Sequence, residues 1–200
     1  IQNTALKFVG SATIGTDHLD RSALAQQGIT WSNAPGCNAQ AVAEYVIAAL
    51  LHLKPELIDA DQRFTLGIIG LGNVGSRLAY MAELLGWKVL GHDPFVERSG
   101  IQQVSLNELF AQADAISIHV PLTYRGEHPT FHLIDAKALS EMKKTAILIN
   151  SARGPVVAEA DLMADIRATQ RQVVLDVFEH EPEISAELLN LVGLVTPHIA

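Results

Sequence analysis

Three polar residues in the second half of the chain, Arg153, Glu181 and His198, each follow a short apolar run that is typical of a β-strand. An arginine can bind an anionic group, and a histidine beside a carboxylate can move a proton near neutral pH. The carboxyl ends of parallel strands form the edge at which open α/β sheets bind ligands. The three side chains could therefore meet in one crevice, where their types indicate acid–base chemistry on a small anion.

A G-x-G-x-x-G motif, formed by Gly70, Gly72 and Gly75, follows another apolar run and opens an amphipathic stretch. In such a motif the first glycine makes a tight turn, the second lets a pyrophosphate approach the backbone, and the third lets the helix pack on the strand. Asn73 and Val74 would present free N–H groups at the start of that helix. The motif predicts a dinucleotide site, although glycine-rich turns also occur without one.

Asp93 strengthens this prediction because it follows the next apolar run, Lys88–His92. A carboxylate in this place can accept hydrogen bonds from both ribose hydroxyls of the adenosine half. It would also repel a 2′-phosphate, so NAD is favoured over NADP as the cofactor. In the alternative interpretation, Asp93 only begins the Asp93-Pro94 turn.

The hydrophobic pattern predicts the elements that must position these side chains. Short apolar runs alternate with amphipathic stretches, which is typical of βαβ units around a parallel sheet. The predicted strands are Leu6–Val9, Ile29–Trp31, Leu66–Ile69, Lys88–Gly91, Ala115–His119, Ala146–Ile149, Val173–Val177 and Leu194–Val195. The predicted helices are Asn38–Leu53, a helix from the glycine motif to near Gly86, and three capped helices that begin after Ser105, Asp135 and Ser185. We therefore expect an α/β fold with a Rossmann-type doubly wound parallel sheet.

The composition excludes several classes of protein. With 200 residues and 48% hydrophobic content, the chain can bury a sizeable core. A net charge of −8 opposes binding to nucleic acid or to an anionic membrane surface. The single cysteine, Cys37, cannot form an internal disulfide, which favours the cytoplasm. No histidine has metal-ligand spacing with a cysteine or carboxylate, and we expect no metal, no membrane span and no signal peptide.

Four motifs carry a more specific signal. They are the glycine motif and the runs NSARG at 150–154, LDVFEHEP at 175–182 and TPHIA at 196–200. Together they resemble the successive signatures of the D-2-hydroxy-acid dehydrogenases. The resemblance implies that His198 is the catalytic base, that Glu181 fixes its tautomer, and that Arg153 binds the substrate carboxylate. Alternatively, Arg153 is a surface arginine in a turn, Glu181 a solvated acid in a loop and His198 a packed histidine at a strand end. Glu179 competes with Glu181 for the catalytic role, but the Glu-Pro position matches the family and favours Glu181.

The same resemblance implies further contacts with the cofactor. Asp176 corresponds to an acid near the nicotinamide carboxamide. Ser151 and Ala152 would lie along the cofactor beside the catalytic arginine, and Val120 with Pro121 would lie under the adenine. These five residues complete the predicted cofactor site.

The resemblance also implies a division into domains. The polar segment Lys54–Arg63, which contains Pro55, predicts a break in the chain. We expect the C-terminal piece of a flavodoxin-like substrate domain at residues 1–36, a connecting helix and linker at 37–63, and an NAD-binding Rossmann domain at 64–200. The chain would then be a piece of a longer protein that forms a homodimer.

Three segments narrow the substrate: Phe8–Asp20, Ala34–Ala39 and the long loop Pro121–Thr130. They resemble a branch of the family that oxidises a small phosphorylated 2-hydroxy acid during pyridoxal phosphate synthesis. By that resemblance Thr13 touches the substrate, since a hydroxyl and neighbouring N–H groups in a glycine-containing turn can bind a carboxylate. Another D-2-hydroxy-acid dehydrogenase, such as one acting on phosphoglycerate, and a non-catalytic NAD(H)-sensing module remain as alternatives.

Overall fold

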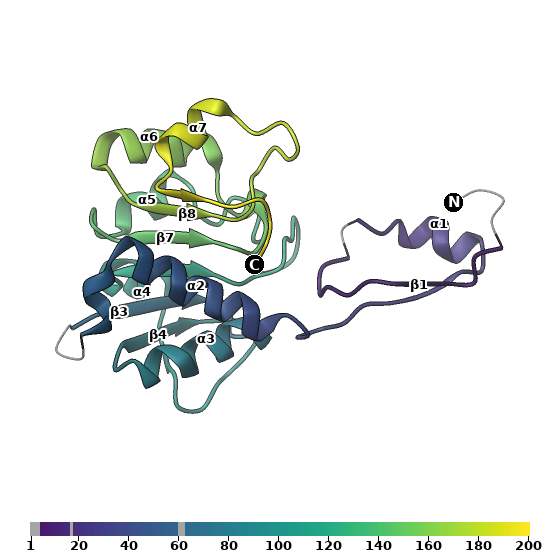
Figure 1. The fold of residues 1–200 in the computed structure, drawn as a ribbon, viewed down its shortest axis with the longest axis horizontal. Helices are drawn as coiled ribbons and strands as arrows, with labels where there is room; N and C mark the ends of the chain where they lie inside the picture. The colour runs from purple at the N-terminus through teal and green to yellow at the C-terminus, as the bar shows by residue number, and fades with distance from the viewer. Residues whose placement is uncertain (1–4, 17, 60–62) are drawn as a thin grey trace.

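The computed structural model describes residues 5–16, 18–59 and 63–200 (Figure 1). Position 17, which belongs to the substrate-branch signature, and residues 60–62 of the predicted linker lie outside the described residues. Two parallel sheets are present in the described part of the chain, one of two strands and one of seven. The two sheets organise two units that differ in size.

The smaller unit is a single βαβ arrangement near the N-terminus. Strands β1 (Phe8–Gly10) and β2 (Thr30–Ser32) pair in parallel, and helix α1 (Arg21–Gln26) connects them. Asp20 caps this helix, because its carboxylate accepts a hydrogen bond from the Ala23 amide at 2.9 Å. Figure 1 shows this unit, in purple, projecting away from the larger sheet.

The larger unit is a seven-stranded parallel sheet with the strand order β5-β4-β3-β6-β7-β8-β9. Its strands are β3 (Thr65–Ile69), β4 (Lys88–His92), β5 (Gln102–Gln103), β6 (Ala115–Ile118), β7 (Ile147–Asn150), β8 (Val173–Leu175) and β9 (Leu194–Val195). The chain winds outward from β3 through β4 and then returns to β6 on the other side, so the direction of winding changes between β3 and β6. This order confirms the predicted doubly wound sheet. In such sheets ligands bind at the carboxyl ends of the strands, which is where the predicted site residues lie.

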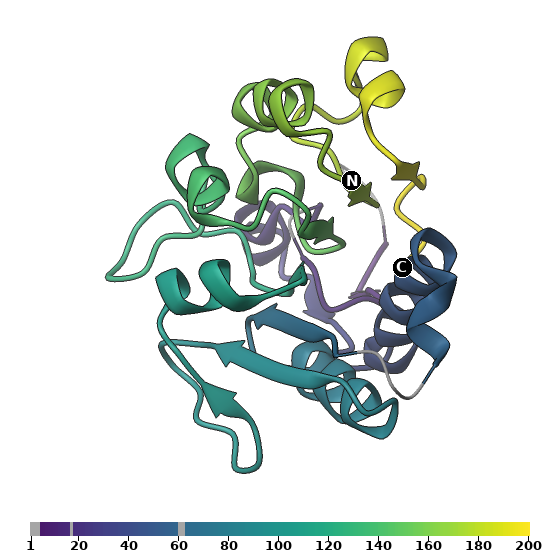
Figure 2. The same ribbon diagram turned by 90° about the vertical axis from the view of Figure 1, so that its left-hand side faces the viewer.

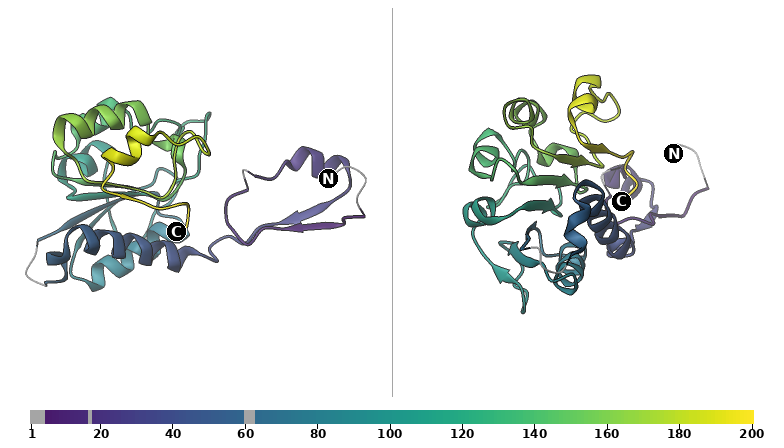
Figure 3. Two further views of the ribbon diagram at one scale, coloured as in Figure 1. Left: turned by 45° about the horizontal axis from the view of Figure 1, so that its top comes forward. Right: turned by 60° about the vertical axis from the view of Figure 1, so that its left-hand side comes forward.

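Helices cover both faces of the large sheet, as the turned views in Figures 2 and 3 show. They are α2 (Ala39–Leu53), α3 (Asn73–Leu84), α4 (Leu106–Gln112), α5 (Ala136–Glu141), α6 (Glu159–Thr169), α7 (Ala186–Leu191) and the 3-10 helices η1 (Pro55–Ile58) and η2 (Gly154–Val156). None of the helices in the described ranges has the length and apolarity needed to cross a bilayer.

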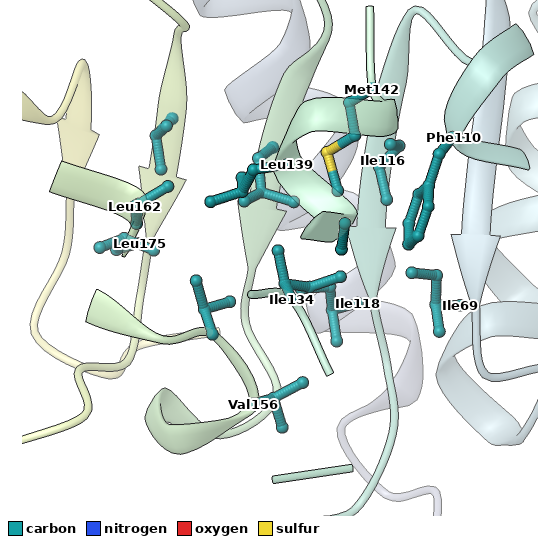
Figure 4. Close-up of a cluster of buried hydrophobic side chains, with 14 of the residues drawn as sticks. Ile69, Phe110, Ile116, Ile118, Ile134, Leu139, Met142, Val156, Leu162 and Leu175 are labelled. Atoms are coloured by element: carbon teal, nitrogen blue, oxygen red, sulfur yellow. The ribbon is translucent and has the colours of Figure 1, made fainter. Parts of the chain in front are cut away.

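Two hydrophobic clusters lie on opposite faces of the sheet because successive strand residues point to opposite sides. Leu148 of β7 packs among residues of α4 to α7, in the cluster of Figure 4. Its neighbours Ile147 and Ile149 pack in the other cluster, with residues of α2 and α3. The near-continuous apolar runs of the sequence are therefore strands that are buried on both faces.

The sequence pattern did not predict the 3-10 helices η1 and η2, nor the elements α1, α6 and β5. Each buries few apolar side chains. Leu24 alone is buried in α1, α6 buries Leu162 and Ile166 with Glu159, and both residues of β5 are exposed. Such segments carry little hydrophobic periodicity, so pattern analysis does not detect them.

Most predicted boundaries are confirmed to within two residues. The strand predicted at Val173–Val177 ends earlier, at Leu175. The Asp176 amide still donates to the Asn150 carbonyl at 3.0 Å, while the Asp176 side chain binds the C-terminal segment. The three predicted caps are present, and Ser105 forms a complete capping box with Glu108.

Candidate active site

The glycine motif forms a turn between β3 and α3 that leaves no room for side chains at two positions. Gly70 has φ +93°, and a Cβ there would lie 2.4 Å from the carbonyl oxygen of His119. A Cβ on Gly75 would lie 1.9 Å from the carbonyl oxygen of Gly70. At Gly72, in contrast, a Cβ would meet no described atom within 4 Å. The second glycine therefore borders open space, as a backbone that a pyrophosphate approaches must.

Asp93 follows β4 and makes three hydrogen bonds with the backbone. Its Oδ1 accepts from the amides of Phe95 at 2.9 Å and Val96 at 3.1 Å, and its Oδ2 accepts from Leu71 at 2.8 Å. Asp93 thus begins the turn, as the alternative interpretation predicts. Its hydrogen bond with Leu71 also holds the glycine loop in place. A carboxylate has about four acceptor sites, so capacity remains for a ribose hydroxyl, and that contact stays a prediction.

The other predicted cofactor residues border the same edge. A Cβ built on Gly70 would lie 3.0 Å from Cγ1 of Val120, which places Val120 beside the glycine turn. Asn73 and Val74 form the first turn of α3, after the N-cap Gly72. The carbonyl of Pro121 accepts a hydrogen bond from the Thr130 hydroxyl at 2.5 Å, so the long loop folds back on its own start.

Ser151 has an unsatisfied hydroxyl group. Its Oγ is buried and has no hydrogen-bond partner among the residues that the structure describes. The next residue, Ala152, is buried, and its amide donates to Oδ1 of Asn150 at 3.1 Å. A buried hydroxyl without a partner is costly. The open space at Gly72 and the free Ser151 hydroxyl therefore fit a bound dinucleotide.

Arg153 lies on the loop after β7, and two interactions fix its backbone. The side chain of Asn150 donates to the Arg153 carbonyl at 2.9 Å. Gly154 packs so closely on the loop after β8 that a Cβ there would lie 1.8 Å from the carbonyl oxygen of Phe178. The loops that carry Arg153 and Glu181 are thus held against each other.

The guanidinium of Arg153 lies against the N-terminal unit, where Gly15 leaves room for it. A Cβ on Gly15 would lie 1.8 Å from Nη2 and 3.0 Å from Cζ of Arg153. Thr13 belongs to the same turn, and its hydroxyl donates to the Gly15 carbonyl at 3.0 Å. The structure therefore brings the predicted substrate-binding turn next to the predicted substrate-binding arginine. No sequence motif marks Gly15 by itself, because its role depends on a contact between distant segments.

Glu181 and His198 come from the loops that follow β8 and β9. Oε1 of Glu181 accepts a hydrogen bond from the Phe178 amide at 2.8 Å, and Oε2 lies 4.0 Å from Nδ1 of His198. Both side chains are partly open to solvent, with exposures of 42% for Glu181 and 52% for His198. Since β7, β8 and β9 are neighbours, Arg153, Glu181 and His198 follow three adjacent strands at one edge of the sheet.

Glu179, the competing acid, takes part in a different set of contacts. Its Oε1 lies 2.5 Å from Nε2 of His132, and its Oε2 accepts from the Glu159 amide at 2.9 Å. Burial alone would raise the pKa of Glu179, but these hydrogen bonds and the charges of His132 and His180 lower it. Glu179 therefore holds the first turn of α6, which supports the choice of Glu181 as the partner of His198.

Asp176 is completely buried at the end of β8. Its Oδ1 accepts hydrogen bonds from the Thr196 hydroxyl at 2.6 Å and the Ile199 amide at 2.8 Å, and its Oδ2 accepts from the Ala200 amide at 2.9 Å. The predicted contact with a nicotinamide stays a prediction. The structure gives Asp176 a further role, which its sequence neighbours do not indicate: it anchors the segment that carries His198.

Metal chemistry has no evident site in this part of the molecule. Across residues 5–16, 18–59 and 63–200, no three His, Cys, Asp or Glu side chains form a group that could hold a metal ion.

His119 lies beside the glycine turn, and its Nε2 forms a hydrogen bond with the Ser117 hydroxyl at 2.8 Å. Burial lowers the pKa of His119 to about 3, so its ring is neutral at physiological pH.

Comparison with known proteins shows which family the chain resembles. Residues 54–200 match the family described as D-isomer specific 2-hydroxyacid dehydrogenase, NAD binding domain. Erythronate-4-phosphate dehydrogenase from Acinetobacter baumannii is 69% identical over 200 residues, which are 100% of this chain and 56% of the relative. The protein of that name from Psychrobacter sp. is 53% identical, over 99% of this chain and 55% of the relative. The chain thus spans little more than half the length of these relatives.

Solved structures agree with this assignment. D-Lactate dehydrogenase from Aquifex aeolicus, complexed with NAD and lactic acid, is 31% identical with a TM-score of 0.78, over 97% of this chain and 69% of that chain. NAD-dependent formate dehydrogenase from Staphylococcus aureus, in complex with NAD, is 27% identical with a TM-score of 0.79, over 96% and 65% of the two chains. The chain therefore belongs to the D-isomer specific 2-hydroxyacid dehydrogenases and carries the NAD-binding domain of that family.

Proposed function

We propose that the protein containing this chain oxidises 4-phospho-D-erythronate to (R)-3-hydroxy-2-oxo-4-phosphooxybutanoate with NAD⁺, as a step of pyridoxal 5′-phosphate synthesis. The observation that carries the proposal is 69% identity, over every residue of the chain, with a relative named for this substrate. The arrangement of Arg153, Glu181 and His198 at one sheet edge supports it, because these side chains suit the oxidation of a 2-hydroxy acid.

The cofactor would be held by residues around the glycine turn. The amides of Asn73 and Val74 at the start of α3 suit a pyrophosphate, and the remaining acceptor capacity of Asp93 suits a ribose. Ser151 would gain the hydrogen-bond partner that it lacks among the described residues. When bound, NAD⁺ supplies the acceptor for the hydrogen and electron pair that leave C2 of the substrate.

His198 accepts the proton of the substrate hydroxyl in this proposal. Its Nδ1 faces Oε2 of Glu181 at 4.0 Å, and a proton on Nδ1 leaves Nε2 as the base. The Glu181 carboxylate stabilises the imidazolium that forms when Nε2 takes the proton. Its distance from His198 exceeds that of a hydrogen bond, and such contacts commonly shorten when substrate binds.

Arg153 and the turn around Thr13 would hold the substrate. The guanidinium can bind the substrate carboxylate through two parallel N–H groups and polarise the oxygen on C2, which lysine does less well. The Thr13 hydroxyl lies on the same turn as Gly15, against which Arg153 packs. The substrate would therefore bind between the N-terminal unit and the large sheet.

The remaining proposals concern the organisation of the protein. We infer a substrate-domain piece at residues 1–36, a connecting helix and linker at 37–63 and an NAD-binding domain at 64–200, in agreement with the separate sheets. By resemblance to the family, the intact protein acts as a cytoplasmic homodimer on a small phosphorylated 2-hydroxy acid, without nucleic acid or membrane as a partner. Light scattering of the intact gene product measures the dimer directly.

A substrate panel tests the proposed activity. The intact gene product is assayed by NADH absorbance with 4-phospho-D-erythronate, phosphoglycerate, glycerate and lactate at equal concentrations. The proposal predicts the highest kcat/KM with 4-phospho-D-erythronate. A higher kcat/KM with phosphoglycerate or glycerate would assign the protein to another branch of the family, and the absence of turnover with every acid would favour an NAD(H)-sensing module.

A further inference from the structure

His198 lies in an irregular segment, residues 196–200, that follows β9. Its φ of +54° is in the left-handed region, which residues with a side chain seldom adopt. The next two amides, of Ile199 and Ala200, donate to the two carboxylate oxygens of Asp176 at 2.8 Å and 2.9 Å. One buried carboxylate therefore fixes the turn that carries His198.

Asp176 also holds this segment on the other side of His198. The hydroxyl of Thr196, two residues earlier, donates to Oδ1 of Asp176 at 2.6 Å, and the Thr196 amide donates to the Leu175 carbonyl at 3.0 Å. A buried carboxylate is stable only when donors surround it. The position of His198 thus depends on the orientation of Asp176, which depends in turn on the Thr196 hydroxyl.

Tyr45 of α2 extends this network. Its hydroxyl lies 2.7 Å from Oγ1 of Thr196. A threonine hydroxyl has one proton, and that of Thr196 is directed to Asp176, so Tyr45 must be the donor in its own hydrogen bond. Burial raises the pKa of Tyr45, and the charge of Asp176 raises it further, although the hydrogen bond with Thr196 lowers it. Tyr45 therefore keeps its proton at neutral pH.

The arrangement of elements places α2 beside the catalytic segment. The views in Figures 1, 2 and 3 agree that the C-terminal end of the chain lies next to α2. Seven side chains of α2 are buried, and the helix packs in the cluster that contains α3. Because α2 is packed in this way, the Tyr45 hydroxyl has a fixed position, and its hydrogen bond orients the Thr196 side chain.

We infer that Tyr45 is a positioning residue for His198, acting through Thr196 and Asp176. This inference rests on the proposed function, in which His198 is the base. Without the Tyr45 hydroxyl, the Thr196 oxygen loses its donor, and only its own hydrogen bond to Asp176 still orients the side chain. Asp176 would then hold the turn around His198 less rigidly, and Nε2 of His198 would spend less time in line with the substrate hydroxyl.

The experiment compares four variants of the intact gene product: Tyr45→Phe, Thr196→Val, Thr196→Ser and the double variant Tyr45→Phe/Thr196→Val. We expect Tyr45→Phe to lower kcat about five- to tenfold, the effect of one lost hydrogen bond, with KM for NAD⁺ changed less than about twofold. Thr196→Ser, which keeps the hydroxyl, should restore most of the kcat that Thr196→Val loses. The double variant should lose no more than the larger single loss, because both changes break one network.

Two reference variants separate this inference from the proposed function. Tyr80→Phe removes a hydroxyl from an exposed tyrosine of α3 and should leave kcat unchanged. His198→Gln should abolish most turnover. Amide hydrogen exchange of the peptide that covers residues 196–200 supplies a readout besides activity, and Tyr45→Phe should speed it.

The outcomes are distinct. If His198→Gln abolishes turnover while Tyr45→Phe changes neither kcat nor the exchange of residues 196–200, the positioning role is wrong and the proposed function stands. Multiplicative losses in the double variant, or equal kcat for Thr196→Ser and Thr196→Val, also overturn the positioning role. If His198→Gln leaves turnover intact, the catalytic assignment fails and the positioning role fails with it.

Discussion

At the scale of single residues, two glutamates two positions apart show how contacts separate the roles of identical side chains. Glu179 is paired with His132 and the start of α6, whereas Glu181 faces His198. The sequence favoured Glu181 only through a family resemblance. No pattern in the sequence shows that His132, which is distant from Glu179 in the sequence, forms a hydrogen bond with the Glu179 carboxylate.

Replacing each glutamate by glutamine tests this separation. We expect Glu181→Gln to lower kcat by about two orders of magnitude, because a neutral amide neither fixes the His198 tautomer nor stabilises its cation. The matched change Glu179→Gln should leave kcat nearly unchanged and lower the melting temperature by roughly 2–4 °C through a weaker bond to His132. Steady-state kinetics and thermal unfolding of both variants measure these effects, and equal loss of kcat in the two variants would contradict the assignment.

Gly15 provides a second test at the residue scale. The Cβ of Gly15→Ala would lie 1.8 Å from Nη2 of Arg153, so the guanidinium must move. We expect kcat/KM for the hydroxy acid to fall about tenfold or more, with unchanged affinity for NAD⁺. In an Arg153→Lys background, Gly15→Ala should lower kcat/KM much less, since the guanidinium that the alanine displaces is already absent. A similar loss in both backgrounds would show that Gly15 acts independently of Arg153.

At the scale of elements, the sequence predicts what hydrophobic periodicity and capping residues control. The strands of the large sheet other than β5, and helices α2 to α5 and α7, have buried apolar faces or explicit caps, and the structure confirms them. Helices α1 and α6 and strand β5 were not predicted because neighbouring elements, rather than an apolar pattern of their own, hold them in place. In the candidate site, the residues on motif loops were predictable, whereas Gly15 and Tyr45 depend on contacts between segments far apart in the sequence.

The turn between β3 and α3 allows stability and cofactor binding to be changed separately. Gly75→Ala places a Cβ 1.9 Å from the Gly70 carbonyl oxygen, so α3 must shift, and we expect loss of thermal stability as well as NAD⁺ affinity. Gly72→Ala meets no described atom within 4 Å and should fold normally, while its methyl group blocks the approach of a pyrophosphate. Melting curves and NADH fluorescence titration distinguish the two. Unchanged NADH affinity in Gly72→Ala would contradict the assigned cofactor site.

At the scale of the whole molecule, the strand order brings residues from distant parts of the chain to one edge of the sheet. Arg153, Glu181 and His198 follow the adjacent strands β7, β8 and β9, although βα units separate them in the sequence. The sequence predicted this edge because parallel strands must end together. It could not predict the packing of the N-terminal unit on Arg153, which depends on the shapes of both surfaces.

His119 gives the stability of the whole molecule a pH dependence. Its pKa falls from 6.5 to about 3 on folding, so between these values the unfolded chain binds a proton that the folded chain does not. Stability is therefore unaffected by this group above about pH 6.5 and decreases as the pH falls below it, by about 1.4 kcal/mol per pH unit.

The variant His119→Gln, which keeps a polar atom near Ser117, should lose less stability than the natural chain as the pH is lowered from about 6 to about 4. His52→Gln, at an exposed position of α2, is the matched control and should follow the natural chain. Urea unfolding at each pH gives the free energies of unfolding. Parallel curves for His119→Gln and the natural chain would show that His119 is not buried as a neutral ring.

In the proposed function, His198 acts as the base of an NAD-dependent oxidation at this edge of the sheet. The most direct measurement is turnover of 4-phospho-D-erythronate by His198→Gln in the intact gene product, together with NADH binding by fluorescence. We predict that kcat falls by about 10²- to 10⁴-fold, because general-base catalysis is lost, while NADH binds with unchanged affinity. Turnover close to that of the natural protein, with NADH still bound, would show that His198 is not the base.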